Sequence, residues 1–192
     1  MLQAPPKPLT LAEFLRLPET EPASEYVNGK ISQKPMPKGK HSILQTKLSA
    51  VLNAALQPDQ IAWAFSELRC TFGERSTVPD VCIFTGSRIP CDANGEIANN
   101  IETHPDWSIE ILSPEQSQTR VTKNILHCLH HGAQMGWLID PEEQTVLVYF
   151  PPAQVKVLER ASDRLPMPAF AANGEITVGE LFSWLVVRPP VV

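Results

Sequence analysis

The strongest constraint on the fold is a pair of acidic residues placed inside two short hydrophobic runs. Asp80 lies within residues 78–84 and Glu110 lies within residues 107–112. Each run is rich in β-branched or aromatic residues and bounded by turn residues, which is typical of a buried strand. A buried carboxylate costs on the order of several kcal/mol unless a partner neutralises it. Two such acids therefore predict a shared cation, and hard oxygen ligands favour Mg²⁺ or Mn²⁺.

The composition is that of an ordinary globular protein. The 192 residues suit one domain, with 43% hydrophobic and 19% charged residues. No apolar run approaches the ~20 residues that cross a bilayer, and no signal-peptide pattern opens the chain. The four cysteines lack CxxC spacing, which favours reduced thiols. We expect a cytoplasmic domain over residues 1–192, with residues 1–9 as a loose arm and neither a membrane partner nor a small-molecule cofactor.

The charges are unevenly distributed along the chain. The net charge of −5 argues against a general polyanion binder. No acidic residue occurs between Glu25 and Asp59, however, and that window holds five lysines: Lys30, Lys34, Lys38, Lys40 and Lys47. A basic face of this kind can contact the phosphates of DNA. A solvated hairpin and helix would explain the same lysines equally well.

Local signals in the first third of the chain predict a helix, a hairpin and a longer helix. Thr10 and Glu13 form a capping-box pattern for a short helix over residues 11–17. Asn28-Gly29 predicts a type I′ turn between two strands. Apolar residues recur at helical spacing over residues 40–57, and His41 lies on that stripe, so we expect its side chain to face inward.

The remainder of the chain alternates predicted strands with one long helix. Ser113, Pro114 and Glu115 predict the start of a helix that runs to about residue 131, with Gly132 as its C-terminal cap. A strand or a bent strand is expected at residues 61–72. Further strands are expected at residues 78–84, 107–112, 136–141, 145–150 and 155–158, and a closing helix at residues 178–185. This order predicts an α/β or α+β fold, in which helices pack on the faces of a sheet.

The two acidic strands and the following helix supply the parts of a hydrolytic site. If the strands are neighbours, Asp80 and Glu110 can reach one cation. Lys123 lies on the helix that follows, where a lysine with a lowered pKa can activate a water molecule. There are structural alternatives for both acids. Asp80 could form a turn hydrogen bond, and Glu110 could pair with Arg69 or Arg120.

Taken in order, these segments resemble a known protein family. The resemblance is carried by Glu25-Tyr26-Val27-Asn28-Gly29-Lys30-Ile31, His41 at the start of a helix, Val78-Pro79-Asp80-Val81, Ile109-Glu110-Ile111-Leu112-Ser113-Pro114, Lys123, and Gly132 followed by Trp137-Leu138-Ile139-Asp140-Pro141. The series spans roughly residues 10–160. It resembles the Uma-type family of restriction endonucleases, within the PD-(D/E)XK nuclease superfamily.

The resemblance implies a restriction-endonuclease-like core, with a mixed β-sheet flanked by helices, that usually forms a homodimer. It also implies a metal-dependent endonuclease that hydrolyses DNA phosphodiester bonds. Asp80 and Glu110 would then hold Mg²⁺ or Mn²⁺. Removing the charge of Asp80 is expected to stabilise the metal-free fold by relieving its repulsion with Glu110.

The resemblance assigns supporting residues as well. The superfamily's lysine normally stands two residues after the glutamate, where this chain has Leu112. In the family this lysine lies on the following helix, which matches Lys123. Glu25 and His41 match the family's accessory acid and histidine, and would support a second metal ion or the leaving group.

Two parts of the sequence depart from the family pattern, and a cluster of histidines suggests a different kind of site. Cys128 stands where the family has an aromatic residue, and residues 134–136 replace an acidic-aromatic approach to the Trp strand. These departures leave open an alternative, a nuclease-fold protein that no longer cuts and serves as a binding or assembly module. His127, His130 and His131 lie beside Cys128, but no second zinc half-site follows at suitable spacing. We therefore expect a polar helix end there.

Overall fold

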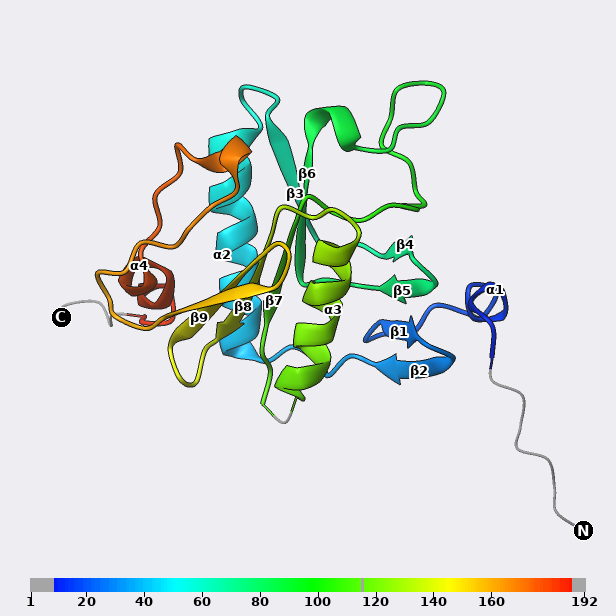
Figure 1. Cartoon of the computed structure of the whole chain (residues 1–192), viewed down its shortest axis with the longest axis horizontal. Coiled ribbons are helices and arrows are strands. Elements are labelled where there is room, and N and C mark those ends of the chain that lie inside the picture. Colours follow the sequence, from blue (N-terminus) through cyan, green and yellow to red (C-terminus); the bar gives the residue numbers. More distant parts are fainter. Residues whose placement is uncertain (1–8, 115, 188–192) are drawn as a thin grey trace, which may run out of the picture.

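A six-stranded mixed sheet forms the centre of the protein (Figure 1). The computed structural model describes residues 9–114 and 116–187. In spatial order the sheet contains β10 (Gln154–Leu158), β9 (Thr145–Phe150), β8 (Met135–Asp140), β7 (Trp107–Ile111), β6 (Val81–Thr85) and β3 (Ala62–Ser66). Only the β7–β8 pair is parallel among these neighbours. This mixed architecture with helices on its faces confirms the predicted fold class.

A second, smaller sheet stands beside the first. Its strands, in spatial order, are β2 (Lys30–Gln33), β1 (Ser24–Val27), β5 (Arg75–Thr77) and β4 (Cys70–Phe72). The predicted hairpin is confirmed, because Asn28 and Gly29 have φ angles of 51° and 78° between β1 and β2. The helices of the described residues are α1 (Leu11–Phe14), α2 (Gly39–Leu56), α3 (Gln118–His130) and α4 (Val178–Ser183), with 3₁₀ turns at Gly86–Arg88 and Ala169–Ala171.

Helix α2 covers one face of the central sheet with a row of leucines. Leu44, Leu48, Leu52 and Leu56 recur every fourth residue and are all buried. They pack with residues of β6, β7 and β8 that point to the same face, including Trp107 and Trp137. Val51 and Ala55 belong to the wider predicted stripe but are exposed. Only the row at four-residue spacing faces the sheet over the whole helix.

Helix α3 covers the opposite face of the same sheet. Val121, Ile125 and Leu129 pack against Leu138 of β8 and Tyr149 of β9. This contact is close at Gly136, where a Cβ would lie 2.2 Å from Cγ2 of Ile125. The central sheet is therefore buried on both sides over β7 and β8, which explains why residues 107–111 are buried on either face of the strand.

Three predicted boundaries are wrong. The predicted strand over residues 61–72 divides into β3 and β4, which belong to different sheets. The break contains Glu67 with a φ angle of +53°. Ser113 does not cap α3; Ser117 does, and its Oγ accepts from the N–H of Arg120 at 3.4 Å. The first helix keeps its predicted capping box but ends at Phe14.

Parts of two expected elements lie outside the described residues. Glu115, expected in the first turn of α3, and residues 1–8 of the expected arm lie outside the described residues. Within the described part, no helix has the length and apolar character needed to cross a membrane.

Candidate active site

The pairing of β6 with β7 brings the two acids of the sequence analysis together. Val81 lies opposite Ile109 in this antiparallel pair, so Asp80, one residue before β6, comes opposite Glu110. Residues that face each other in this way have Cβ atoms about 5 Å apart on the same side of the sheet. The N–H of Ile111 also donates to Oδ2 of Asp80 at 2.7 Å. Asp80 is 1% exposed and Glu110 is 3% exposed, so both carboxylates are withdrawn from bulk water.

A lysine from the small sheet forms an ion pair with Asp80. Lys34 directly follows β2, and its Nζ lies 2.5 Å from Oδ1 of Asp80. The same amine donates to the carbonyl of Val78 at 2.7 Å and lies 3.6 Å from Oε1 of Glu67. The Lys34 side chain is only 9% exposed. It was expected on an open basic face, but the structure places it among the acids, because the β1–β2 hairpin folds against the start of β6.

His41 and Glu25 complete the inner part of the site. His41 lies in the first turn of α2, as expected on its inward side, and its Nε2 is 3.1 Å from Oδ2 of Asp80. Glu25 of β1 accepts from the N–H of Val78 at 2.9 Å. Asn124 of α3 donates to Oε2 of Glu25 at 3.3 Å. The structure thus gathers Glu25 and His41 with the acid pair.

The electrostatics separate the two central acids. Burial favours the neutral form of Asp80, but the Lys34 ammonium and the His41 ring outweigh it and hold the pKa of Asp80 below its usual value. Burial, followed by the charge of Asp80, raises the pKa of Glu110 well above its usual value. Burial also raises the pKa of Glu25. The cluster therefore contains one carboxyl group with a lowered pKa beside two with a raised pKa.

The structure does not bring Lys123 to the acid pair. Lys123 is exposed on α3, and among the described residues no hydrogen bond or ion pair joins its amine to an acid. Its neighbour Asn124 takes the inward position instead and contacts Glu25. One helical residue corresponds to a rotation of about 100°, which turns Lys123 away from the site. The expectation that Lys123 points toward Asp80 and Glu110 is therefore wrong.

The other lysines of the predicted basic face lie at the surface. Lys30, Lys38 and Lys47 are exposed. Lys40 is exposed too, and its Nζ forms an ion pair with Oε2 of Glu142 at 2.9 Å. These four lysines are spread over the β1–β2 hairpin and α2, so only Lys34 of the five joins the acid cluster.

Besides Asn124, the site contains two more residues that the sequence analysis missed. Gln45 donates to the carbonyl of Asp80 at 2.8 Å and to Oε1 of Glu67 at 3.1 Å. The backbone N–H of Glu67 donates to the same Asp80 carbonyl at 3.2 Å. Gln45 lies one helical turn after His41, so helical spacing could have identified it. Nothing in the sequence marks Glu67, because its place depends on the turn between β3 and β4.

These residues border an open cleft. A cavity of about 570 Å³ is lined by Lys34, His41, Gln45, Glu67 and Asp80, together with residues of the segment before β1. A substrate can therefore reach the side of Asp80 that carries Lys34 and His41.

The donor set suits a hydrated cation better than a closed metal cage. Among the described residues, no three His, Cys, Asp or Glu side chains are arranged to hold a metal ion by themselves. Asp80 and Glu110 offer two carboxylates, and Oε1 of Glu110 is buried without a hydrogen-bond partner in the described structure. Mg²⁺ commonly binds through one or two carboxylates and keeps several waters. The pair therefore fits Mg²⁺ or Mn²⁺ in this mode.

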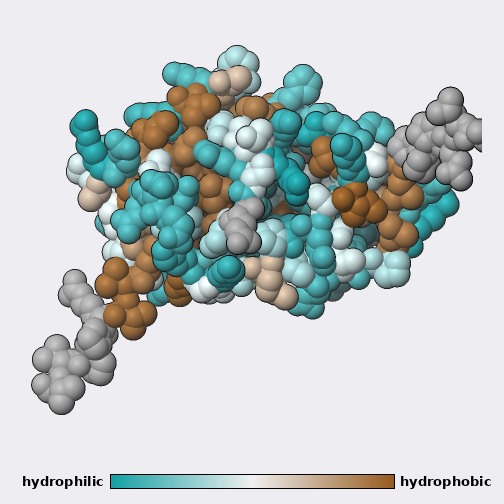
Figure 2. Space-filling model, turned by 90° about the horizontal axis from the view of Figure 1, so that it is seen from below, coloured by the Kyte–Doolittle hydropathy of each residue, from teal (hydrophilic) through white to brown (hydrophobic). Residues whose placement is uncertain are grey.

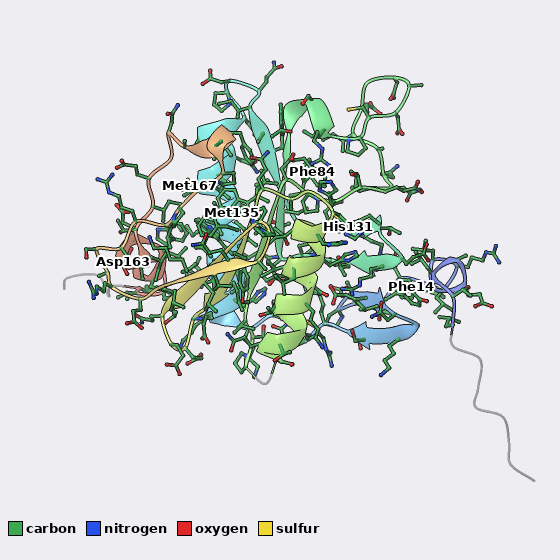
Figure 3. All side chains as sticks on the ribbon, in the orientation of Figure 1. Phe14, Phe84, His131, Met135, Asp163 and Met167 are labelled. Carbon is green, nitrogen blue, oxygen red and sulfur yellow. The ribbon has the colours of Figure 1, made fainter. Side chains whose placement is uncertain are left out.

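The histidines at the end of α3 pack around an aromatic side chain. The His127 ring stacks on Phe72 with centroids 4.7 Å apart, and its Nε2 lies 3.1 Å from the Phe72 carbonyl oxygen. His131, labelled in Figure 3, meets the same phenyl ring edge-on. Burial lowers the pKa of His127 to about 4, which keeps this ring neutral. All four cysteines are free, and Cys128 is buried.

Comparison with known proteins finds a matching family and similar solved structures. Residues 11–179 match the Uma2 family, described as "Putative restriction endonuclease". The chain is also similar to a crystal structure from Anabaena variabilis ATCC 29413, described as a "putative nuclease belonging to DUF820". The two sequences are 60% identical over 93% of this chain and 100% of that chain, with a TM-score of 0.92. No curated protein matches the chain.

Proposed function

Because the chain belongs to the Uma2 family, whose description is that of a restriction endonuclease, we propose that it is a metal-dependent endonuclease that hydrolyses DNA phosphodiester bonds. The observation that carries the proposal is the cross-strand pair of Asp80 and Glu110. Both are buried, and one oxygen of Glu110 has no hydrogen-bond partner in the described structure. Such a pair is costly in a metal-free protein and gains from a divalent cation.

Asp80 and Glu110 would hold the metal ion. When bound, Mg²⁺ or Mn²⁺ supplies Lewis-acid stabilisation of the phosphate charge and a place for the attacking water. Asp80 is a ready ligand, because its lowered pKa keeps it ionised at neutral pH. At Glu110 a metal ion competes more strongly with a proton, because burial and the charge of Asp80 raise the pKa of this carboxyl group. The affinity for metal should therefore increase with pH.

In this proposal Lys34, and not Lys123, is the lysine that acts beside the acids, and it acts as a charged donor. Burial disfavours the charged amine of Lys34, but the surrounding carboxylates raise its pKa, so the amine stays protonated. A protonated amine cannot act as a general base. It can donate hydrogen bonds to a phosphate oxygen or to the attacking water, and so stabilise the charge that develops.

His41 and Glu25 act as positioning residues in this proposal. His41 holds one oxygen of Asp80 while Lys34 holds the other, so the carboxylate has a defined orientation. Glu25 ties Val78, two residues before Asp80, to Asn124 of α3. It thereby joins the small sheet to the helix beside the site.

One observation favours a second candidate function. The Lys34 ammonium already neutralises Asp80 inside the protein. A nuclease fold that keeps this internal ion pair could persist without metal and serve as a binding or assembly module. Metal-induced stabilisation distinguishes the two functions, because a module without catalysis needs no affinity for Mg²⁺ or Mn²⁺.

The test of the proposed function is a nicking assay on supercoiled plasmid DNA. We expect conversion to open-circular or linear DNA with Mg²⁺ or Mn²⁺, and none with EDTA or with the Asp80→Asn variant. Circular dichroism must show that this variant is folded. Wild-type protein that neither cuts nor gains thermal stability with millimolar Mn²⁺ would exclude the proposed enzyme and favour the module.

A further inference from the structure

A second hollow lies between the β1–β2 hairpin and the beginning of α3, which stand side by side in Figure 1. Its volume is about 480 Å³. Four cationic residues line it: Lys30 of β2, Arg75 of β5, and Arg120 and Lys123 of α3. Figure 2 views this end of the molecule from below and shows hydrophilic residues across the middle of the face. We propose that this hollow binds a backbone phosphate of a nucleic-acid strand.

The cations of the hollow have no acidic counterpart in the described structure. None of the described residues that line it is an aspartate or a glutamate. Within residues 9–114 and 116–187, no ion pair engages Lys30, Arg75, Arg120 or Lys123. Nη1 of Arg75 donates to the Lys123 carbonyl oxygen at 3.5 Å. Four uncompensated cations around one hollow are unusual on a chain with a net charge of −5 and indicate an anionic ligand.

Arg120 stands where the helix itself disfavours a positive charge. Ser117 is the N-cap of α3, so Arg120 lies in the first turn of this helix. The amide groups of a first turn carry a partial positive charge, which stabilises acids and opposes cations. A phosphate placed here would be bound by the free N–H groups of the helix start and by Arg120 together. The position of Arg120 is thus unfavourable for the free helix and favourable for a helix with a bound phosphate.

The hollow adjoins the candidate active site through shared residues. Asn124 lines the hollow and also donates to Glu25 of the acid cluster. The strand β2 carries Lys30 into the hollow and ends next to Lys34, which contacts Asp80. A nucleic-acid strand that presents one phosphate to the acid cluster can therefore place a neighbouring phosphate in this hollow. This identification of the ligand as a nucleic acid rests on the proposed function.

The inference gives Lys123 a binding role in place of the catalytic one. Lys123 belongs to the hollow and not to the acid pair, so it would contact a phosphate that does not react. Such contacts fix the position of a strand without reading its sequence. Loss of Lys123 is then expected to weaken binding without changing how the bound strand is cut.

The test measures nucleic-acid binding without metal, so that cleavage plays no part. We compare the affinity of the wild type with that of Arg120→Glu/Lys123→Glu by fluorescence anisotropy in EDTA. The probes are a fluorescein-labelled 16-nucleotide single strand and a duplex of the same sequence. The matched control is Lys156→Glu/Arg160→Glu. These two residues line another hollow, which also contains Glu159 and Asp163, and the change in net charge is the same.

We expect the double change in α3 to weaken binding by about tenfold to a hundredfold, because a hydrogen bond to a charged group is worth about a factor of ten. The dependence of log K on log salt should become shallower by about 1.8 on the duplex, the value for two lost phosphate contacts. The control variant should change binding by less than threefold. Arg120→Glu alone should not lower the melting temperature, because an acid suits the first turn.

Two results would overturn the inference. One is equal weakening by the α3 variant and the control, which would indicate general repulsion. The other is unchanged binding by the α3 variant with an intact fold. Failure of the nuclease proposal gives a different result: wild type binds through the hollow in EDTA yet cuts nothing with Mg²⁺ or Mn²⁺. Cleavage by the wild type together with binding that ignores the hollow would refute this inference alone.

Discussion

Lys34 and Asp80 lie 46 positions apart in the chain, and their side chains form an ion pair of 2.5 Å in the interior of the candidate site. Both side chains are less than a tenth exposed. The pair changes the energetics expected from the acids alone. Lys34 stabilises Asp80 as a carboxylate and lowers its pKa, whereas burial and the charge of Asp80 raise the pKa of Glu110.

This division predicts opposite effects of neutralising the two acids in the metal-free protein. Asp80→Asn should destabilise the fold by about 3 kcal/mol, because it removes the buried anion that lies closer to the Lys34 ammonium than Glu67 does. Glu110→Gln should raise the melting temperature at pH 8 by about 3 °C, or ~1 kcal/mol for a chain of this size. Differential scanning calorimetry in EDTA measures both. The earlier expectation that Asp80→Asn stabilises the metal-free fold is therefore reversed.

The same pKa shifts predict a pH dependence of stability. The pKa of Glu110 is raised on folding, so its contribution is fully present below the usual pKa of glutamate and is lost as pH rises through the folded value. The pKa of Asp80 is lowered, so its contribution is present above the usual pKa of aspartate and is lost as pH falls through the folded value.

Metal binding should restore the stability that the protein loses at high pH through Glu110. Mn²⁺ at 5 mM exceeds a millimolar Kd about fivefold. The increase in melting temperature that it causes should be larger at pH 8 than at pH 5.5, because Mn²⁺ competes with a proton for Glu110. Thermal melts across this range provide the measurement. Glu110→Gln is the control and should abolish the pH dependence of the shift. A shift of the same size at both pH values would show that Glu110 is not a ligand.

Lys34→Met should separate metal binding from cleavage. Removal of the ammonium frees Oδ1 of Asp80 from its ion pair, so the affinity for Mn²⁺ measured by calorimetry should increase. The cleavage rate should nevertheless fall by about 100-fold or more, as expected for the loss of a charged donor at the reacting phosphate. Lys156→Met, at an exposed position of β10, is the matched control and should leave both quantities unchanged. Full cleavage by Lys34→Met would exclude a catalytic role for Lys34.

The proposed homodimer can be tested at the edge of the central sheet. Strand β10 pairs only with β9 among the described strands, and its Val155 and Val157 are 45% and 58% exposed. We expect sedimentation at micromolar concentration to show a dimer, with an interface above about 1,000 Å² in total. Val155→Lys/Val157→Lys should shift it to monomer. A dimer that survives this change would use a different surface, and a monomeric wild type would contradict the homodimer.

Much of the fold follows from local patterns in the sequence. The turn at Asn28-Gly29, the leucine row of α2 and the positive φ of Gly132, directly after the C-cap His131 of α3, depend on residues close together in the chain, so spacing and turn chemistry identify them. The start of α3 was missed because Ser113 and Ser117 are both acceptable caps, and local preference does not decide between them. The division of residues 61–72 between two sheets was also missed, because it depends on partners elsewhere in the chain.

The sequence by itself determined that Asp80 and Glu110 are buried acids, because each stands in a run that has to be buried. It could not determine which lysine serves them. Lys123 follows Glu110 on the next predicted element of the chain, yet helix rotation turns it to the surface, where it joins Arg120. Lys34 is distant along the chain, yet the packing of the small sheet against β6 carries its amine to Asp80. Only the tertiary structure decides which lysine pairs with the acids, because a charge pairs with its neighbour in space. Beyond one helix or hairpin, sequence spacing says little about which residue that neighbour is.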